Sequence, residues 1–187
     1  LGILVWQDMV SPTKFIDTKS NLNTSDFELE HNIKVDQLYN HPSIIQWVLF
    51  NESWGQYDTE RLTAALKAKD PTRLVINASG WHDKKVGDIR DFHDYTIHPA
   101  IALVNKNDDR AMVLGETGGI DLLIPGHLWT TDLKGGTKIK TDWNIDFKKG
   151  IVKSADELIE KYTILLDDLF QLKKYGLNAV VYTQISD

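Results

Sequence analysis

The stretch His41–Gly55 reads HPSIIQWVLFNESWG and contains a helix stop, an apolar run and a polar strand end. Pro42 disfavours helical backbone in the residue before it, so a preceding helix should end there. The continuous apolar run Ile44–Phe50 is typical of a strand buried on both faces, as in a parallel sheet. The run stops at Asn51 and Glu52, which places an amide and a carboxyl group at the carboxyl end of this strand.

The same pattern, an apolar run that gives way to polar residues, recurs along the chain. Helical spacing and capping residues between the runs predict helices from Ser25 or Asp26 to about Asn40, from Thr59 to about Asp70, and from a capping box at Ser154. Residues 82–94 are predicted to be a polar loop, and residues 117–150 a long excursion. Strands are predicted at Gly2–Trp6, Ile44–Phe50, Leu74–Ala78, Tyr95–His98, Ala111–Gly115 and Asn178–Tyr182.

Buried strands that alternate with helices predict an α/β fold with a parallel sheet. An open doubly wound sheet usually has a glycine-rich loop after its first strand, and Trp6-Gln7-Asp8-Met9 has no glycine. We therefore favour a (β/α)8 TIM barrel. With six predicted strands instead of eight, residues 1–187 are interpreted as one partial barrel domain.

Composition excludes several classes of function. The 187-residue chain has a net charge of −6 and no basic cluster long enough for a phosphate-binding stripe, so we expect no nucleic acid as partner. No apolar run reaches the roughly 18 residues that span a bilayer, so no membrane association is predicted. The absence of cysteine excludes thiol nucleophiles and cysteine-bound zinc. The histidine spacing matches no zinc hydrolase, and we expect neither a metal nor another cofactor.

Polar side chains gather directly after the predicted strands, above all Asp8, Glu52 and Glu116. In a parallel barrel the carboxyl ends of all strands share one face, and active sites lie there. Cleavage of a glycosidic bond needs two carboxyl groups, one to protonate the leaving oxygen and one, in retaining enzymes, to attack the anomeric carbon. Glu52 and Glu116 are the candidates for that pair.

The segment His41–Gly55, with His-Pro-Ser, an apolar run and Asn51-Glu52, resembles the fourth barrel strand of glycoside hydrolase family 2. This family includes β-galactosidases, β-glucuronidases and β-mannosidases. The resemblance implies that Glu52 is the acid/base and that Asn51 hydrogen-bonds the sugar 2-hydroxyl. Further matching segments are Leu1–Met9, Asp70–Arg73, Asp91–Tyr95, Leu114–Gly119 and Val181–Asp187, the last most similar to a bacterial branch of β-galactosidase-like proteins.

The resemblance covers nearly the whole chain and maps it onto barrel strands 3 to 8. It implies that Glu116 is the nucleophile, although Thr117 stands where the family usually has an aromatic residue. Strands 1 and 2 have no counterpart in these residues. We therefore expect the two open sheet edges to pair with a second copy of the chain or to be covered by segments beyond it.

Six further side chains are candidates for sugar contacts, and each also has an ordinary structural interpretation. His93 and Tyr95 could stabilise the nucleophile or line the sugar subsite. Trp54 and Trp81 could stack on a sugar ring or pack in the core. The predicted substrate-binding residues are Asp8, Asn51, Trp54, Trp81, His93 and Tyr95.

These observations predict a retaining glycoside hydrolase that cleaves terminal β-glycosides, with a β-galactosidase-like specificity and a carbohydrate as its partner. The alternative is a truncated barrel fragment that binds carbohydrate without catalysis or has only a structural role. The resemblance is compatible with a periplasmic or secreted protein, and the sequence does not fix the compartment.

Overall fold

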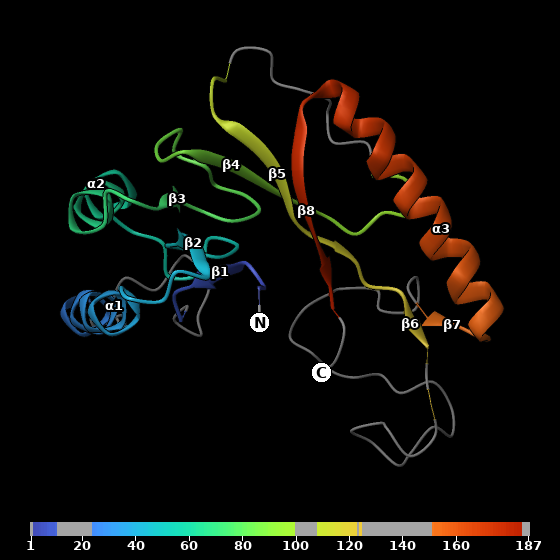
Figure 1. Ribbon diagram of the computed structural model, residues 1–187, viewed down its shortest axis with the longest axis horizontal. Coiled ribbons are helices and arrows are strands. Elements are labelled where there is room, and N and C mark those ends of the chain that lie inside the picture. Colours follow the sequence, from blue (N-terminus) through green and yellow to red (C-terminus); the bar gives the residue numbers. More distant parts are fainter. Residues whose placement is uncertain (1, 11–23, 100–107, 123, 125–150, 185–187) are drawn as a thin grey trace.

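The fold is built on a six-stranded parallel sheet whose strands follow the order of the chain, β1-β2-β3-β4-β5-β8 (Figure 1). The computed structural model describes residues 2–10, 24–99, 108–122, 124 and 151–184. The sheet curls into part of a TIM barrel, as the sequence predicted. Its strands are β1 (Val5–Asp8), β2 (Ile44–Val48), β3 (Leu74–Ile76), β4 (Ile89–Asp94), β5 (Ala111–Gly118) and β8 (Leu177–Thr183).

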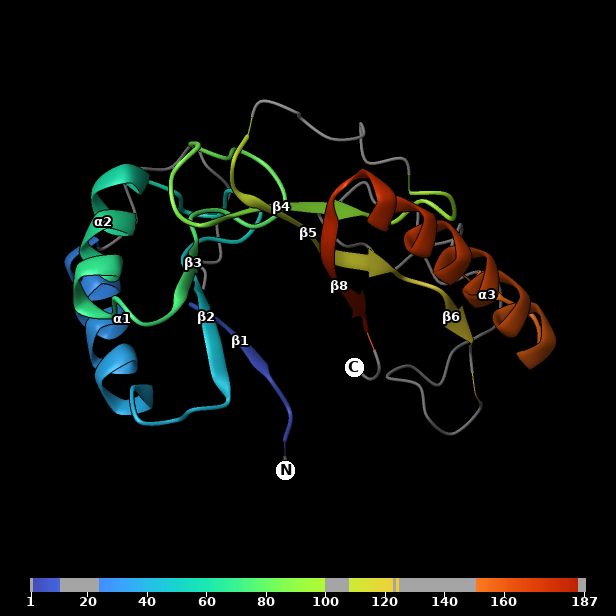
Figure 2. The ribbon, with the colours of Figure 1, turned by 45° about the horizontal axis from the view of Figure 1, so that its top comes forward.

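Helices cover the outer side of this sheet in two groups (Figures 1 and 2). α1 (Thr24–Leu38) and α2 (Thr59–Lys69) lie beside β2 and β3, whereas α3 (Ala155–Leu172) lies beside β8 and is followed by the short 3-10 helix η2 (Lys173–Tyr175). A two-stranded parallel sheet, formed by β6 and β7, lies near the start of α3. These two strands are β6 (Asp121–Leu122) and β7 (Ile151–Val152). No helix in the described residues is long and apolar enough to cross a bilayer.

The outer face of the sheet is covered by two separate apolar layers. In the first, Trp47 and Val75 of β2 and β3 pack against α1 and α2 through residues such as Val35. The second joins the β5–β8 side of the sheet to α3 and comprises Met112, Leu114, Leu165, Leu169, Leu172 and Leu177. Burial of these side chains accounts for the apolar spacing of the helices, because each helix presents one stripe to the sheet.

The inner face of the curled sheet carries its own small core. Val48, Ile76, Ile89 and Val113 come from four neighbouring strands and form one buried cluster. Side chains alternate between the two faces of a strand, so Trp47 points to the helices while Val48 points inward. This two-sided burial explains the continuous apolar runs that the sequence shows, and it resembles one layer of a barrel interior.

One predicted strand was wrong, and the bounds of others shift. The fourth strand is Ile89–Asp94, where a polar loop was predicted, while Tyr95–His98 is not a strand. Its sequence, IRDFHD, has no apolar run, and one of its charged residues, Asp91, is buried instead of facing water. The first strand begins at Val5, where pairing with Ile44 starts, and not at Gly2.

The predicted helix signals after residue 150 are confirmed. Ser154 Oγ accepts a hydrogen bond from the Glu157 amide at 3.1 Å, and the Glu157 carboxylate accepts one from the Lys153 amide at 2.9 Å. Gly176 adopts φ 100°, a left-handed conformation that favours glycine, and ends the helical segment. α2, in contrast, begins at Asp58 without a side-chain cap.

The motif Asp70-Pro-Thr-Arg73 ties the helical layer to the sheet. The Asp70 carboxylate is fully buried and accepts hydrogen bonds from Trp47 Nε1 at 2.9 Å, Thr72 Oγ1 at 2.6 Å and Arg73 Nη1 at 2.7 Å. Arg73 also donates to the carbonyl oxygens of Ile44, Tyr39 and His41. Burial alone raises the pKa of Asp70, but these donors together lower it to about 2.

We expect Asp70→Asn to lower the free energy of unfolding by about 3 kcal/mol at pH 7, because it leaves buried donors and Arg73 without their anion. The folded-state pKa is depressed, so the stabilisation is present above the ordinary pKa of 3.8 and disappears as the pH falls toward about 2. Urea unfolding at several pH values measures this. Asp36→Asn, at an exposed carboxylate, is the control. An equal loss in both variants would contradict the assigned role.

The two edge strands of the sheet are β1 and β8, each paired on one side within the described residues. Exposed apolar side chains lie near both, at Ile3, Leu4, Val180 and Val181. Unpaired strand edges attract further strands. We therefore expect the 187-residue chain, expressed alone, to self-associate in analytical ultracentrifugation, with Val180→Lys shifting it toward monomer. A stable monomer at all concentrations would refute the pairing of open edges.

Candidate active site

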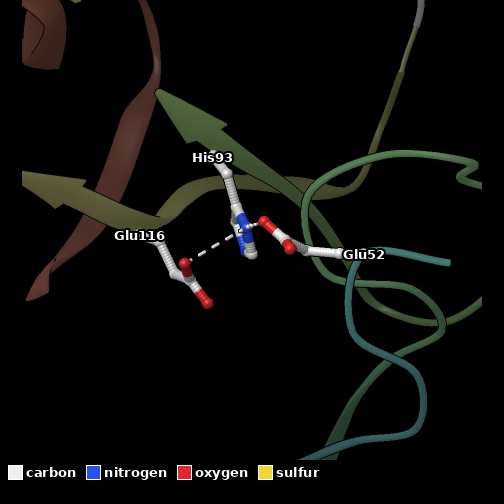
Figure 3. A group of neighbouring side chains, drawn as sticks. All are labelled: Glu52, His93 and Glu116. Carbon is white, nitrogen blue, oxygen red and sulfur yellow. Dashed lines mark hydrogen bonds and ion pairs between the residues drawn. The ribbon is translucent and has the colours of Figure 1, made fainter. Parts of the chain in front are cut away.

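Three ionisable side chains meet at the carboxyl ends of β2, β4 and β5 (Figure 3). His93 Nδ1 lies 2.9 Å from Glu52 Oε1 and 3.5 Å from Glu116 Oε2. One oxygen of each glutamate and this nitrogen all lie within 4.8 Å of one another. The sheet therefore brings together the two glutamates that the sequence singled out, with a histidine between them.

The turn after β2 sets the position of Glu52. Its backbone has φ 48° and that of Ser53 has φ 66°, a left-handed conformation that is uncommon outside glycine. The Glu52 amide donates to the carbonyl oxygen of Ser79 at 2.9 Å, and Asn51 forms a bridge with Ser79. Strained backbone of this kind concentrates at functional sites, and here it directs the Glu52 side chain toward His93.

Glu116 lies within β5, where the pairing with both neighbouring strands shifts register. The Tyr95 hydroxyl donates to Glu116 Oε2. Gly119 has φ 61°, and a Cβ there would lie 3.0 Å from Tyr95 Cδ1, so a larger residue would crowd the tyrosine ring. Burial and then the bond to Glu116 raise the pKa of Tyr95, which keeps the hydroxyl protonated as a donor.

His93 is held on its other side by two buried residues. Its Nε2 lies 2.7 Å from Ser79 Oγ, and Ser79 Oγ donates to Asp91 Oδ2 at 2.7 Å. The indole ring of Trp81 contacts the imidazole edge-on, with ring centroids 5.7 Å apart. Burial lowers the pKa of His93, but the bond with Glu52 and the charges of Glu116 and Asp91 outweigh it and raise the pKa.

Asp8 joins the same group electrostatically. It is the last residue of the edge strand β1, and Lys34 of α1 donates to its backbone carbonyl. Desolvation and then the negative charge of Glu116 raise the pKa of Asp8 to about 6, while Lys34 and His93 lower it. The side chain keeps an exposed surface, so it can accept a hydrogen bond from a ligand.

The remaining predicted site residues lie around this group. Trp81 is 47% exposed, which leaves ring surface free beyond its contact with His93. Asn51 and Trp54 are half-buried, and the Asn51 Oδ1 atom is buried without a hydrogen-bond partner in the described chain. His98 points elsewhere and pairs with Asp168 at 2.6 Å. Trp129 and Trp143, two tryptophans of the predicted excursion 117–150 that could cap the site, lie outside the described residues.

Sequence reasoning did not assign Ser79 or Asp91 to the site. Both are buried, at 5% and 3% exposure, and they support His93 instead of facing the mouth of the barrel. The available signal was the spacing Asp91-Phe92-His93, because alternate residues of a strand share one face. That signal was lost when residues 82–94 were interpreted as a loop.

The cluster also contains the kinds of ligand atom that can bind a divalent cation. Glu52, His93 and Glu116 each offer one ligand atom within the 4.8 Å limit. In this structure His93 Nδ1 is hydrogen-bonded to Glu52 and lies beside the second carboxylate, Glu116.

Comparisons with known proteins bear on the family and the fold. The model of glycosyl hydrolases family 2, TIM barrel domain, matches residues 10–113, more than half of the chain; this segment contains Glu52 and His93 and ends before Glu116. Among solved structures, the chain is similar to a family 2 β-galacturonidase from Eisenbergiella tayi bound to galacturonate, with TM-score 0.60 and 17% identity. The match covers 98% of this chain and 33% of that one, so this chain spans about a third of its length. At this identity, the likeness shows the fold. No match was found among curated proteins.

Proposed function

We propose a retaining glycoside hydrolase activity for this chain, which belongs to glycosyl hydrolases family 2. In this proposal Glu116 is the nucleophile and Glu52 the general acid/base, and the substrate is a terminal β-glycoside. The observation that carries it is the approach of the two carboxylates, with one oxygen of each within 4.8 Å of the other. Retaining enzymes hold their carboxyl groups about 5 to 5.5 Å apart, whereas inverting enzymes need more room for a water molecule.

Double displacement then proceeds in two steps. A Glu116 oxygen attacks the anomeric carbon while Glu52 gives its proton to the leaving oxygen, so the glycosidic bond breaks and a glycosyl ester forms. Glu52, now ionised, takes a proton from water, and the resulting hydroxide displaces Glu116 from the sugar. The hydrogen bond from Tyr95 to Glu116 supports this reading, because it fixes one carboxylate oxygen and leaves the other to attack.

The surrounding residues are proposed to bind the sugar. Family resemblance assigns to Asn51 a hydrogen bond with the 2-hydroxyl group. The exposed ring of Trp81 and the half-buried ring of Trp54 offer apolar surface for the faces of a sugar. Asp8, at the rim, offers a carboxylate oxygen to a hydroxyl group.

We infer that the site takes a neutral sugar of the galactose type in preference to a uronic acid. Asp8, Glu52 and Glu116 concentrate negative charge, and the nearby cation Lys34 is engaged by the Asp8 backbone. An additional carboxylate on the substrate would meet like charges at close range, which costs binding energy. The β-galacturonidase to which the chain is similar binds the acidic counterpart of galactose, so the two substrates form a direct comparison.

The alternative function is a barrel fragment that binds carbohydrate without turnover or has a structural role alone. It retains the exposed aromatic side chains but makes no use of the carboxylate pair. The proposed nucleophile and acid lie close together with supporting hydrogen-bond donors around them, and this arrangement favours the enzyme.

Covalent trapping tests the nucleophile directly. We expect a 2-deoxy-2-fluoro-β-galactoside with a good leaving group to label Glu116 in the protein as its gene encodes it, because the fluorine slows hydrolysis of the glycosyl ester. Peptide mass spectrometry locates the label. Glu116→Gln should take up none, and Glu160→Gln, on the exposed part of α3, should be labelled as the wild type is. A label at another carboxylate would refute the assignment.

Leaving-group dependence tests the acid. We expect Glu52→Gln to slow hydrolysis of alkyl glycosides by about 100-fold or more, because a poor leaving group needs its proton in the transition state. Activated aryl glycosides should be affected much less in the glycosylation step. Steady-state kcat/KM for both substrate types measures the difference. Equal losses would remove Glu52 from the acid/base role.

A further inference from the structure

A line of hydrogen bonds runs from Glu52 into the protein through His93, Ser79 and Asp91. We propose that Ser79 and Asp91 are positioning residues that keep His93 protonated on both nitrogens, so that its Nδ1–H holds Glu52 Oε1 and leaves Oε2 to exchange the catalytic proton. The inference rests on the proposed acid/base role of Glu52. Neither Ser79 nor Asp91 needs to touch the sugar.

The direction of the bonds follows from the number of protons available. A serine hydroxyl has one proton, and Ser79 lies 2.7 Å from both Asp91 Oδ2 and His93 Nε2. An ionised Asp91 can only accept, so the Ser79 proton points to it. Ser79 Oγ must then accept from His93, which places a proton on Nε2.

With Nε2 protonated, the state of Nδ1 decides how Glu52 is held. A neutral ring would present a lone pair to Glu52 Oε1, which suits only a carboxyl group that turns its proton inward. A doubly protonated ring donates from Nδ1 at 2.9 Å, whether Glu52 carries a proton on Oε2 or is ionised. Only the doubly protonated ring can hold Glu52 in both steps of a double displacement, because Glu52 is protonated before the first step and ionised before the second.

The residues of this line of hydrogen bonds are buried, so each of them depends on its particular partner. The His93 side chain has no exposed surface, and Ser79 and Asp91 are 5% and 3% exposed, so water cannot replace a missing partner. Asp91 Oδ1 also accepts from the Gly115 amide at 2.7 Å, directly before Glu116 in the chain. A Cβ on Gly115 would lie 2.2 Å from Asp91 Oδ2, so glycine is required for this contact. The same aspartate therefore fixes both sides of the site.

The charges around His93 favour the protonated ring. Glu52 faces it from the end of β2, Glu116 from β5, Asp91 from its own strand and Asp8 from β1. Burial lowers the pKa of His93, but Glu52, Glu116 and Asp91 together raise it, and the described residues place no cation in contact with the ring. Loss of the Ser79 acceptor would remove one hydrogen bond that stabilises the protonated His93 ring. The pair of His93 and Glu52, when both are protonated, would then lose its first proton at a lower pH.

Ser79→Ala in the protein as its gene encodes it tests the proposal. We expect kcat/KM for an alkyl glycoside to fall about tenfold at pH 7, with its alkaline limb shifted to lower pH, while an activated aryl glycoside changes less than about twofold. Ser79→Thr keeps the hydroxyl and should restore the profile. Thr63→Val is the matched control, because Thr63 is a buried hydroxyl without a hydrogen-bond partner in the described chain.

A nitrogen-15 NMR titration of the histidine rings supplies a readout without turnover. In the wild type, His93, assigned by its loss in His93→Gln, should carry both protons at neutral pH, and Ser79→Ala should lower the pH at which it titrates. A wild-type ring that is neutral at pH 6, or Ser79→Ala kinetics that overlay those of Thr63→Val, would overturn the proposal. These failures differ from failure of the proposed function, which would show as unchanged alkyl-glycoside hydrolysis in Glu52→Gln.

Discussion

Parallel pairing in chain order is the constraint on which the site depends. Because β2, β4 and β5 run in one direction within the same sheet, their carboxyl ends open at one mouth. The inner cluster of Val48, Ile76, Ile89 and Val113 holds the sheet in its curled form, and the outer helices prevent it from flattening. Residues separated by more than sixty positions, such as Glu52 and Glu116, thereby approach although β2 and β5 are not neighbours in the sheet.

The strand that the sequence marks most clearly is β2, whose two faces are both buried by apolar partners. Trp47 and Val48 of β2 are adjacent in sequence, pack on opposite faces and leave an unbroken apolar run. β4 escaped detection because its buried positions include a carboxylate, Asp91, which is satisfied by Ser79 and the Gly115 amide. The periodicity of a sequence reports only hydrophobic positions. It cannot identify a polar side chain that is buried with hydrogen-bond partners from distant strands.

The residues of the candidate site also fall into those that a sequence pattern predicts and those that only the contacts identify. Glu52 and Glu116 could be predicted because each follows or ends an apolar run and belongs to a recognisable motif, and Tyr95 came with them. The Asp70 motif was also recognised, but its role as a buried anchor for Trp47 and Arg73 emerges from the contacts alone. Supporting residues such as Ser79 are defined by hydrogen bonds across the sheet, and no local pattern in the sequence encodes them.

Electrostatics explains why one histidine can organise so acidic a mouth. Carboxylates this close repel one another, and the raised pKa values of Asp8 and Asp91, both about 6, reflect desolvation and the nearby negative charge. In the protonation state proposed above, His93, which contacts both Glu52 and Glu116, would offset part of that repulsion. In that proposal, the charged imidazole lets the two glutamates lie close together, so the buried support of the ring would belong to the site as the carboxylates do.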